Sequence, residues 1–381
     1  MRHRQVALIV AMALLFVAVA ATAQAITLPY QEAGLHPGTP DIEIEVNAAA
    51  GKLYVSDHAA DEIWVVDPGS GAYTLYDVDS PSDAKPDAQG DIWWTNEGTL
   101  LGRINTVTGM LTTWVVGEVG AVNLWGLALD PAGVVWTTEW FSGSVRQFDL
   151  SANQVCTYTL PGGSTSYYIA YEAPHVWLIN WGNDRIFRLD PGAPSNQLRY
   201  WQIPSSPNPS PRGLAVDAAG NLWWADSGMR ALARLDPATD EMTTYLLPVG
   251  RSPRWVYPED GKVWYTESIS GTFGMLDPAA TAGITTTLTS STQSVTPDCG
   301  DLGPGTTVSL SPSQGILEWS SNSMTVLRDD ASWRIYQLPA GGKPYGIASS
   351  GRAWWLSDMG RRKLLRVGNE YTVFLPMVVR H

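Results

Sequence analysis

The sequence contains few cysteines and an excess of acidic over basic residues. Only Cys156 and Cys299 occur among the 381 residues, which excludes a small scaffold held together by many disulfides. The two belong to segments far apart in the chain, so we expect no bond between them, because bridged cysteines need Cα atoms within about 7 Å. Lys and Arg number 24 against 37 Asp and Glu. Nucleic acid is therefore not expected as a partner, because its binding depends on positive charge.

The chain also lacks the motifs of common catalytic sites. It has no glycine-rich phosphate loop, no His-Glu-x-x-His pair and no Gly-x-Ser-x-Gly nucleophile turn. Of five histidines, only His58 and His175 fall within the repeated units described below. His58 can reach the face on which we expect a site, but a single histidine in a turn is a weak signal. No catalytic residue is assigned.

Long apolar runs are absent except at the N-terminus. Arg2 and Arg4 precede an uncharged, mostly apolar stretch from Val6 to Ala20, and a small-residue site ends at Ala25. The stretch is shorter than the roughly 20 residues that span a bilayer. We predict a signal peptide over 1–25, and hence an exported protein (secreted, periplasmic or at the cell surface) with no transmembrane segment after cleavage.

Internal repetition is the main signal that the sequence does contain. The clearest copy has four short β-type runs, separated by turn-forming Gly, Asp, Asn or Pro: Gly213 to Asp217, Asn221 to Asp226, Ala233 to Pro237 and Met242 to Pro248. Its second run recurs at intervals of 39 to 46 residues, ending at Asp57, Asn96, Glu139, Asn180, Asp226 and Glu267, and once more at Asp358. This length is typical of a propeller blade. We predict an all-β fold, a β-propeller of four-stranded blades.

The blade count depends on one degenerate segment. Gly315 to Ser320 and Met324 to Asp329 would be its middle strands, and Trp333 to Pro339 its outer strand. Counting it gives eight blades, which we favour, and omitting it gives seven; both numbers are usual for propellers. Doublets such as Trp223-Trp224 are expected to be core, because successive strand residues point to opposite faces and so enter two different blade interfaces.

Three segments lie outside the repeat. Residues 26–40 are a lead that is either disordered or a strand of the last blade, and the domain proper spans 41–381. A Thr-, Ser-, Gly- and Pro-rich stretch at about 285–307 is predicted to be a surface loop. Tyr371 to Arg380 is interpreted as the outer strand of the last blade, with a C-terminal tail as the alternative. We expect a monomer.

A site is expected where the turns after second strands and the segments leading into first strands share one face beside the channel. The candidate ligand-binding residues are Trp125, Trp140, Tyr168, Arg212, Arg254 and Tyr345. The aromatic rings would bind a ring-bearing ligand, and the arginines, expected near each other beside Asp226 and Glu267, would bind a carboxylate or phosphate. Glu139, Asp226 and Glu267 could provide oxygen ligands for Ca²⁺ or Mg²⁺. Acids at strand ends also shape turns without binding anything.

The tryptophan-rich second strand ending in Thr-Glu, the Arg-Leu-Asp third strand and the Pro-x-Gly-Ile/Leu lead-in resemble the virginiamycin B (streptogramin) lyase family. NHL-repeat and gluconolactonase-like propellers share part of this pattern. The resemblance implies seven blades and elimination of a macrocyclic lactone, with Mg²⁺ and histidines in two Pro-His-x-Ile lead-ins, the later one preceded by Glu. Here the last lead-in, Lys343-Pro344-Tyr345-Gly346-Ile347, has Tyr for His and Lys for Glu. The earlier candidates, Pro253-Arg254-Trp255 and Pro211-Arg212-Gly213, have Arg.

Replacing His by Arg removes both a metal ligand and a general base. The sequence therefore favours an exported propeller that binds a small molecule, glycan or protein on its channel face, or acts as an interaction scaffold there. The alternative is a metal-assisted C–O lyase or lactone hydrolase.

Overall fold

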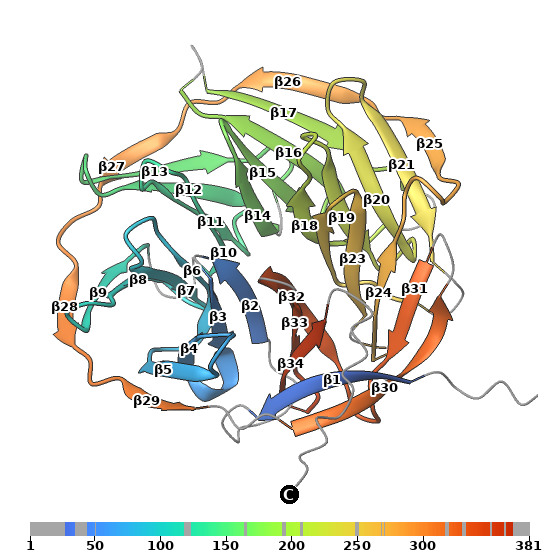
Figure 1. Cartoon of the computed structure of the whole chain (residues 1–381). Helices are drawn as coiled ribbons and strands as arrows, with labels where there is room; N and C mark the ends of the chain where they lie inside the picture. The colour runs from blue at the N-terminus through green and yellow to red at the C-terminus, as the bar shows by residue number, and fades with distance from the viewer. Residues whose placement is uncertain are drawn as a thin grey trace, which may run out of the picture.

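The described strands form a closed ring of seven blades, a β-propeller (Figure 1). The computed structural model describes residues 27–34, 44–49, 51–117, 123–163, 166–192, 196–205, 209–247, 251–267, 269, 271–316, 320–329, 333–350, 353–361 and 363–368. Within these ranges the one helix is a single 3-10 turn, η1 (His58–Ala60). The all-β propeller is thus confirmed with seven blades, and the favoured count of eight is wrong.

In each of the first five blades, four consecutive strands run outward from the channel. They are β2 (Ile44–Ala49), β3 (Lys52–Asp57), β4 (Glu62–Val66) and β5 (Ala72–Asp77); β6 (Pro81–Pro86), β7 (Ile92–Asn96), β8 (Leu100–Asn105) and β9 (Met110–Val115); β10 (Leu124–Leu129), β11 (Val135–Glu139), β12 (Ser144–Asp149) and β13 (Gln154–Thr159); β14 (Ser166–Glu172), β15 (His175–Asn180), β16 (Arg185–Asp190) and β17 (Gln197–Gln202); and β18 (Pro211–Val216), β19 (Leu222–Asp226), β20 (Ala231–Asp236) and β21 (Glu241–Leu246).

The last two blades take one strand each from elsewhere in the chain. Blade 6 contains β22 (Trp255–Glu259), β23 (Lys262–Glu267), β24 (Thr272–Leu276) and β31 (Trp333–Gln337), and blade 7 contains β32 (Pro344–Ser350), β33 (Ala353–Asp358), β34 (Lys363–Gly368) and the N-terminal strand β1 (Thr27–Gly34). A long strand, β30 (Ser320–Asp329), pairs with β31 on one side and β1 on the other. Blades 6 and 7 therefore share one nine-stranded sheet.

These pairings decide two of the sequence-based alternatives, the place of the N-terminal lead and that of the degenerate segment. The lead at 26–40 supplies a strand, β1, which pairs with β34 and closes the ring. The degenerate segment is not a blade, because Trp333 begins the outer strand of blade 6. The strand predicted at 371–380 lies outside the described residues, and the outer edge of β34 is paired with β1.

The tryptophan doublets pack as predicted, with their two rings in different blade interfaces. Trp223 lies in a cluster with Val256 and Tyr265 of blade 6, whereas Trp224 packs with Trp177 and Ile186 of blade 4. The tryptophans of the second strands are all buried: Trp93, Trp94, Trp136, Trp177, Trp223, Trp224, Trp264, Trp354 and Trp355. The core of the ring is thus made at the interfaces between neighbouring blades.

An outer belt runs around the rim, where the sequence predicted a loop (Figure 1). The chain leaves blade 6 after β24 and adds a fifth, antiparallel strand to blades 5, 4, 3, 2 and 1 in turn. These belt strands are β25 (Ile284–Thr287), β26 (Ser290–Ser294), β27 (Asp298–Asp301), β28 (Thr306–Ser309) and β29 (Ser313–Ile316). Through β30 and β31 the chain then returns to blade 6, so the belt completes a full circuit of the ring.

Between its strands the belt carries one apolar residue for each of the four interfaces among blades 1 to 5: Leu288, Val295, Leu302 and Leu310. Leu288 and Val295 are buried in the interfaces of blades 4 and 5 and of blades 3 and 4, respectively. The other two pack against the next two interfaces. The amide of each residue donates a hydrogen bond to the backbone of a blade, as from Leu288 N to Asp240 O at 2.8 Å. These contacts explain why a Thr- and Ser-rich segment holds a fixed course.

A disulfide joins the belt to blade 3, which contradicts the expectation from sequence. Cys156 of β13 lies directly opposite Cys299 of β27 in the antiparallel pair, and the two are bonded. The expectation was wrong because it counted the position of Cys299 along the repeats, whereas the belt carries this residue back to an earlier blade.

No helix in the described part of the chain is long and apolar enough to cross a membrane. The predicted signal peptide, 1–25, lies outside the described residues.

Candidate functional site

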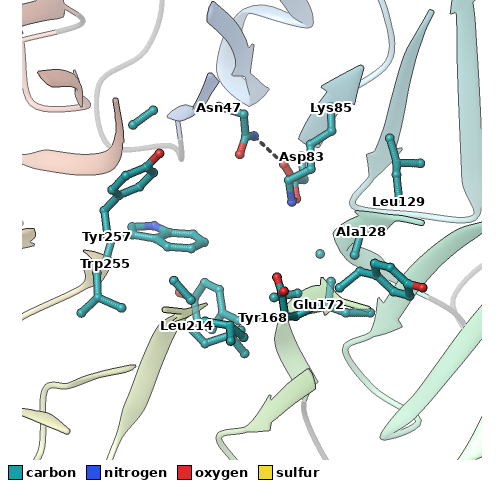
Figure 2. Close-up of a pocket in the computed structure, with 18 of the residues that line it drawn as sticks. Asn47, Asp83, Lys85, Ala128, Leu129, Tyr168, Glu172, Leu214, Trp255 and Tyr257 are labelled. Carbon is teal, nitrogen blue, oxygen red and sulfur yellow. Dashed lines mark hydrogen bonds and ion pairs between the residues drawn. The ribbon is translucent and has the colours of Figure 1, made fainter. Parts of the chain in front are cut away.

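The innermost strands of the blades line a central cavity of about 360 Å³ (Figure 2). All seven inner strands contribute, from β2, β6 and β10 to β14, β18, β22 and β32. Three aromatic side chains form the wall on the side where the first strands begin: Trp125, Tyr168 and Trp255. This is the face on which the sequence predicted the site.

The aromatic wall is held by ring-to-ring contacts between blades. Tyr168 meets Trp255 edge to face at a centroid distance of 4.8 Å, and Trp255 lies 6.5 Å from Tyr345. Gly213 allows this arrangement, because a Cβ at that position would come within 2.3 Å of the Trp255 ring. The rings are therefore held in fixed positions by their contacts with one another.

Trp140 supports this wall from behind. Its ring lies 4.8 Å from the ring of Trp125, edge to face, and 6.1 Å from the ring of Phe141. Trp125 is 6% exposed and lines the cavity, whereas Trp140 does not. Of the six predicted ligand-binding residues, Trp125 and Tyr168 thus line the cavity directly.

Arg254 and Tyr345 form a pair next to the aromatic wall. The Arg254 guanidinium donates from Nη2 to the Tyr345 hydroxyl at 2.7 Å, and its central carbon lies 4.5 Å from the centroid of the tyrosine ring. Tyr345 is almost fully buried, and its carbonyl accepts a hydrogen bond from the Thr266 hydroxyl. The arginine is thereby held beside Trp255, as a cation stacked on an aromatic face.

Arg212 and Arg254 lie on neighbouring lead-ins, as predicted, but their side chains contact different blades. Gly213 N donates to Arg254 O at 3.0 Å, which joins the two lead-ins. The Arg212 guanidinium stacks over Trp181 of blade 4 at 4.9 Å, whereas Arg254 contacts Tyr345 of blade 7. Glu267 forms an ion pair with Arg251, at 3.2 Å.

The three predicted metal ligands are buried at the ends of second strands in three different blades, and each has local partners. Glu139 accepts hydrogen bonds from Ser142 and Arg146, and Glu267 from Arg251 and Thr272. Asp226 Oδ1 accepts from the backbone amides of Ser210 and Met229, both at 2.9 Å. These contacts shape turns.

Burial raises the pKa of Asp226, opposed by hydrogen bonds from neighbouring backbone amides. Nothing in the described ranges brings three His, Cys, Asp or Glu side chains together in a group that could hold a metal.

A polar network inside the channel was missed by the sequence analysis. Asp83 accepts hydrogen bonds from Asn47 Nδ2 at 3.0 Å and Lys85 Nζ at 2.8 Å, and from the amide of Leu127 at 3.1 Å. Lys85 also donates to Leu127 O. The signal was present in Pro81 to Pro86, because β6 carries Asp and Lys where the other inner strands are mostly apolar.

Two tyrosines line the channel beyond the network, Tyr171 and Tyr257. Burial, with the charges of Asp130 and Glu172, raises the pKa of Tyr171, and burial, with Glu259, raises the pKa of Tyr257. Both phenols therefore stay protonated and can donate hydrogen bonds. In Figure 2, Tyr257 and Glu172 line the cavity from two different blades.

A family model identifies the family of this chain, and similar solved structures share its fold. The model of the virginiamycin B lyase family matches residues 46–317. Virginiamycin B lyase from Staphylococcus aureus is similar with a TM-score of 0.68 and 15% identity, over 90% of this chain and 99% of that chain. A streptogramin B lyase structure has a TM-score of 0.66 and 17% identity, over 88% and 97%.

A catalytically inactive variant of the Staphylococcus aureus enzyme, solved with quinupristin, is similar with a TM-score of 0.67 and 16% identity, over 90% of this chain and 99% of that chain. A search of curated proteins found no match.

Proposed function

The chain belongs to the virginiamycin B lyase family, and from this premise we propose that it is an exported binding propeller without lyase activity. Its ligand would carry an aromatic or other flat ring and an anionic group, and would bind at the mouth of the central channel. The ring would pack against Trp125, Tyr168 and Trp255, which line the cavity.

The observation that carries this proposal is the Arg254–Tyr345 pair. The resemblance implies histidines at the lead-in positions of lyases, where this chain has Arg and Tyr. A hydrogen bond of 2.7 Å joins the two side chains, and the permanently charged guanidinium can neither take up a proton nor bind a cation. The family's Mg²⁺ does not fit residues of this kind, because a fixed positive charge occupies the position of a ligand.

Charge at the channel mouth supports an anionic group on the ligand. The protein has a formal net charge of −13, yet Arg254 stands beside the aromatic wall. A guanidinium binds carboxylates and sulfates through two parallel hydrogen bonds, and the adjacent rings exclude water, which strengthens the attraction. Arg212, stacked on Trp181, extends the positive charge across the neighbouring blade.

Export is supported by the disulfide as well as by the N-terminal sequence. Cys156 and Cys299 are bonded, and such bonds persist in the oxidising compartments outside the cytoplasm. The apolar run from Val6 to Ala20, followed by Ala25, has the form of a cleavable signal peptide.

The proposal is tested by ligand capture and turnover on the purified mature protein. The probes are a panel of aromatic carboxylates and sulfates for binding, and a streptogramin B with added Mg²⁺ for lactone opening. We expect capture without turnover, and a loss of about tenfold in affinity for the R212A/R254A variant, equivalent to one charge-assisted hydrogen bond. The matched control is R234A, because Arg234 also stacks on a tryptophan, Trp223, but lines a cleft at the opposite ends of the strands.

Lactone opening that stops on addition of a chelator would replace this proposal with the metal-assisted lyase. Unchanged capture by the double variant would rule out the two arginines as the anion site.

A further inference from the structure

A second cleft, of about 550 Å³, lies between blades 1, 2 and 3, on the side of the ring where second strands end. It shares no lining residue with the channel cavity. Its wall is formed by the turns that follow β3, β5 and β7 and by Asn123 and Phe141 of blade 3. The volume is in the range of about 300–1,000 Å³ that is usual for small-molecule sites.

Hydrogen-bond acceptors dominate the polar side of this cleft. Asp79 is exposed, and its Oδ2 accepts one hydrogen bond, from Asn96 Nδ2 at 3.2 Å. The Glu97 side chain is 40% exposed. Asn123 Oδ1 is buried without a hydrogen-bond donor among the described residues. An amide oxygen in that state costs free energy unless a ligand or water donates to it.

His58 also lines the cleft, and the contacts of its two ring nitrogens define its role as an acceptor there. Its Nδ1 lies 3.2 Å from Ser80 O, and because a carbonyl can only accept, Nδ1 carries the hydrogen. Nε2 is thereby left facing the cleft, 3.6 Å from Glu97 Oε2. This geometry fixes the tautomer of the ring and joins blade 1 to blade 2 across the cleft.

Phe141 offers an apolar platform at the edge of the same cleft. Its ring is 65% exposed, an unusual state for a large aromatic side chain. Trp140 contacts it at 6.1 Å, and Trp125 supports Trp140 at 4.8 Å. The exposed ring therefore projects from a rigid base, and its free face is available to a ligand.

We propose that this cleft binds a neutral saccharide. Sugar hydroxyls donate to Asp79, Glu97 and Asn123 Oδ1, and the C–H face of the pyranose ring packs on Phe141, whose π-face is electron-rich. An anionic ligand would be repelled by the two carboxylates, and a purely apolar one would leave them without water. A metal is disfavoured because no group of three potential ligands is present among the described residues.

The test uses the full mature protein and a panel of neutral methyl glycosides and disaccharides, with glucuronate and glucosamine as charged comparisons. Saturation-transfer NMR detects binding, and titration calorimetry measures affinity. We expect neutral sugars to bind and F141A to weaken them about tenfold, because the stacking contact is lost. The matched control is I269A, which removes an exposed apolar side chain from the corresponding turn of blade 6.

A second variant, N123L, removes the acceptor and retains a side chain of similar size, so the proposal stays testable if either variant folds poorly. R254A must leave sugar binding unchanged, which separates this site from the one at the channel mouth. The proposal is overturned if no neutral sugar binds, if F141A binds as tightly as the unmodified protein, or if a chelator abolishes binding. In the last case Asp79 and Glu97 would act as cation ligands.

Discussion

The Cys156–Cys299 disulfide provides the sharpest test of the belt. It links blade 3 to the middle of the belt, and β27 pairs with β13 over only four residues, exposed on the belt side. We consider the variant C156S/C299S, which removes the bond and retains side chains of similar size. The expected result is a folded ring with a lower unfolding temperature and a belt that opens more often at β27.

The magnitude follows from the length of the closed loop. The cysteines are 143 residues apart, and the chain-entropy relation for a loop of that length gives about 5 kcal/mol at 25 °C as an upper value. An unfolding entropy of about 2.1 cal/mol/K per residue over 381 residues is about 0.8 kcal/mol/K. The same 5 kcal/mol therefore corresponds to a decrease of about 6 °C in Tm.

Calorimetry measures the global effect, and hydrogen exchange followed by mass spectrometry measures the local one. The unmodified protein under reducing conditions is the control, and it should match the variant. We expect faster exchange in peptides covering β26 to β28 and unchanged exchange in second strands such as β15. If the variant keeps both the Tm and the belt protection of the oxidised protein, the belt does not depend on this bond and the reasoning fails.

Three further predictions concern the core, one buried acid and the N-terminus. W224A should lower the free energy of unfolding by about 3–5 kcal/mol in urea titrations, because Trp224 is fully buried; a loss below about 1 kcal/mol would contradict its place in the core. D226N should raise the Tm at pH 7 but not at pH 3: burial raises the pKa of Asp226, so the stability from this carboxyl is complete below its unfolded pKa of about 3.9 and is lost as pH rises through the folded value. An equal Tm difference at both pH values would exclude this explanation. Intact-mass analysis of exported protein should show a chain that starts at Ile26, and retention of 1–25 would contradict cleavage.

The blade structure could be predicted from the sequence because it is local. The second strands repeat at a fixed interval, and the Trp223-Trp224 doublet meets two interfaces through the alternation of strand side chains. The eighth blade was a wrong prediction because β-type sequence does not specify its partner. Trp333 to Gln337 has the composition of an outer strand and is one, but it completes blade 6 across an insertion.

The sequence of the belt contains a periodic apolar pattern, although its composition is that of a loop. Thr, Ser, Gly and Pro indicate a loop. However, an apolar residue recurs every seven or eight residues, at Leu288, Val295, Leu302 and Leu310. This interval is the number of belt residues between one blade interface and the next. At the site, Trp125 and Tyr168 both lie on the cavity wall, because lead-ins share one face. The contact between Arg254 and Tyr345 was not predicted, because Tyr345 belongs to a different blade and comes near only when the ring closes.

The course of the belt also predicts an order in which its strands pair with the blades. Glu241 pairs with Thr287, a short distance along the chain, whereas Leu75 pairs with Ser313, which lies more than half the protein away. Each belt strand docks beside one already held, so every step closes only a short loop, although the final contacts are among the most distant in sequence. We therefore expect the belt strands to pair with the blades in the order from blade 5 to blade 1, which is the reverse of the order of these blades along the chain. The strand that follows the belt, β30, pairs with β31 and β1, and β1 pairs with β34. We therefore expect β1, an early strand in the chain, to be among the last to be held in place.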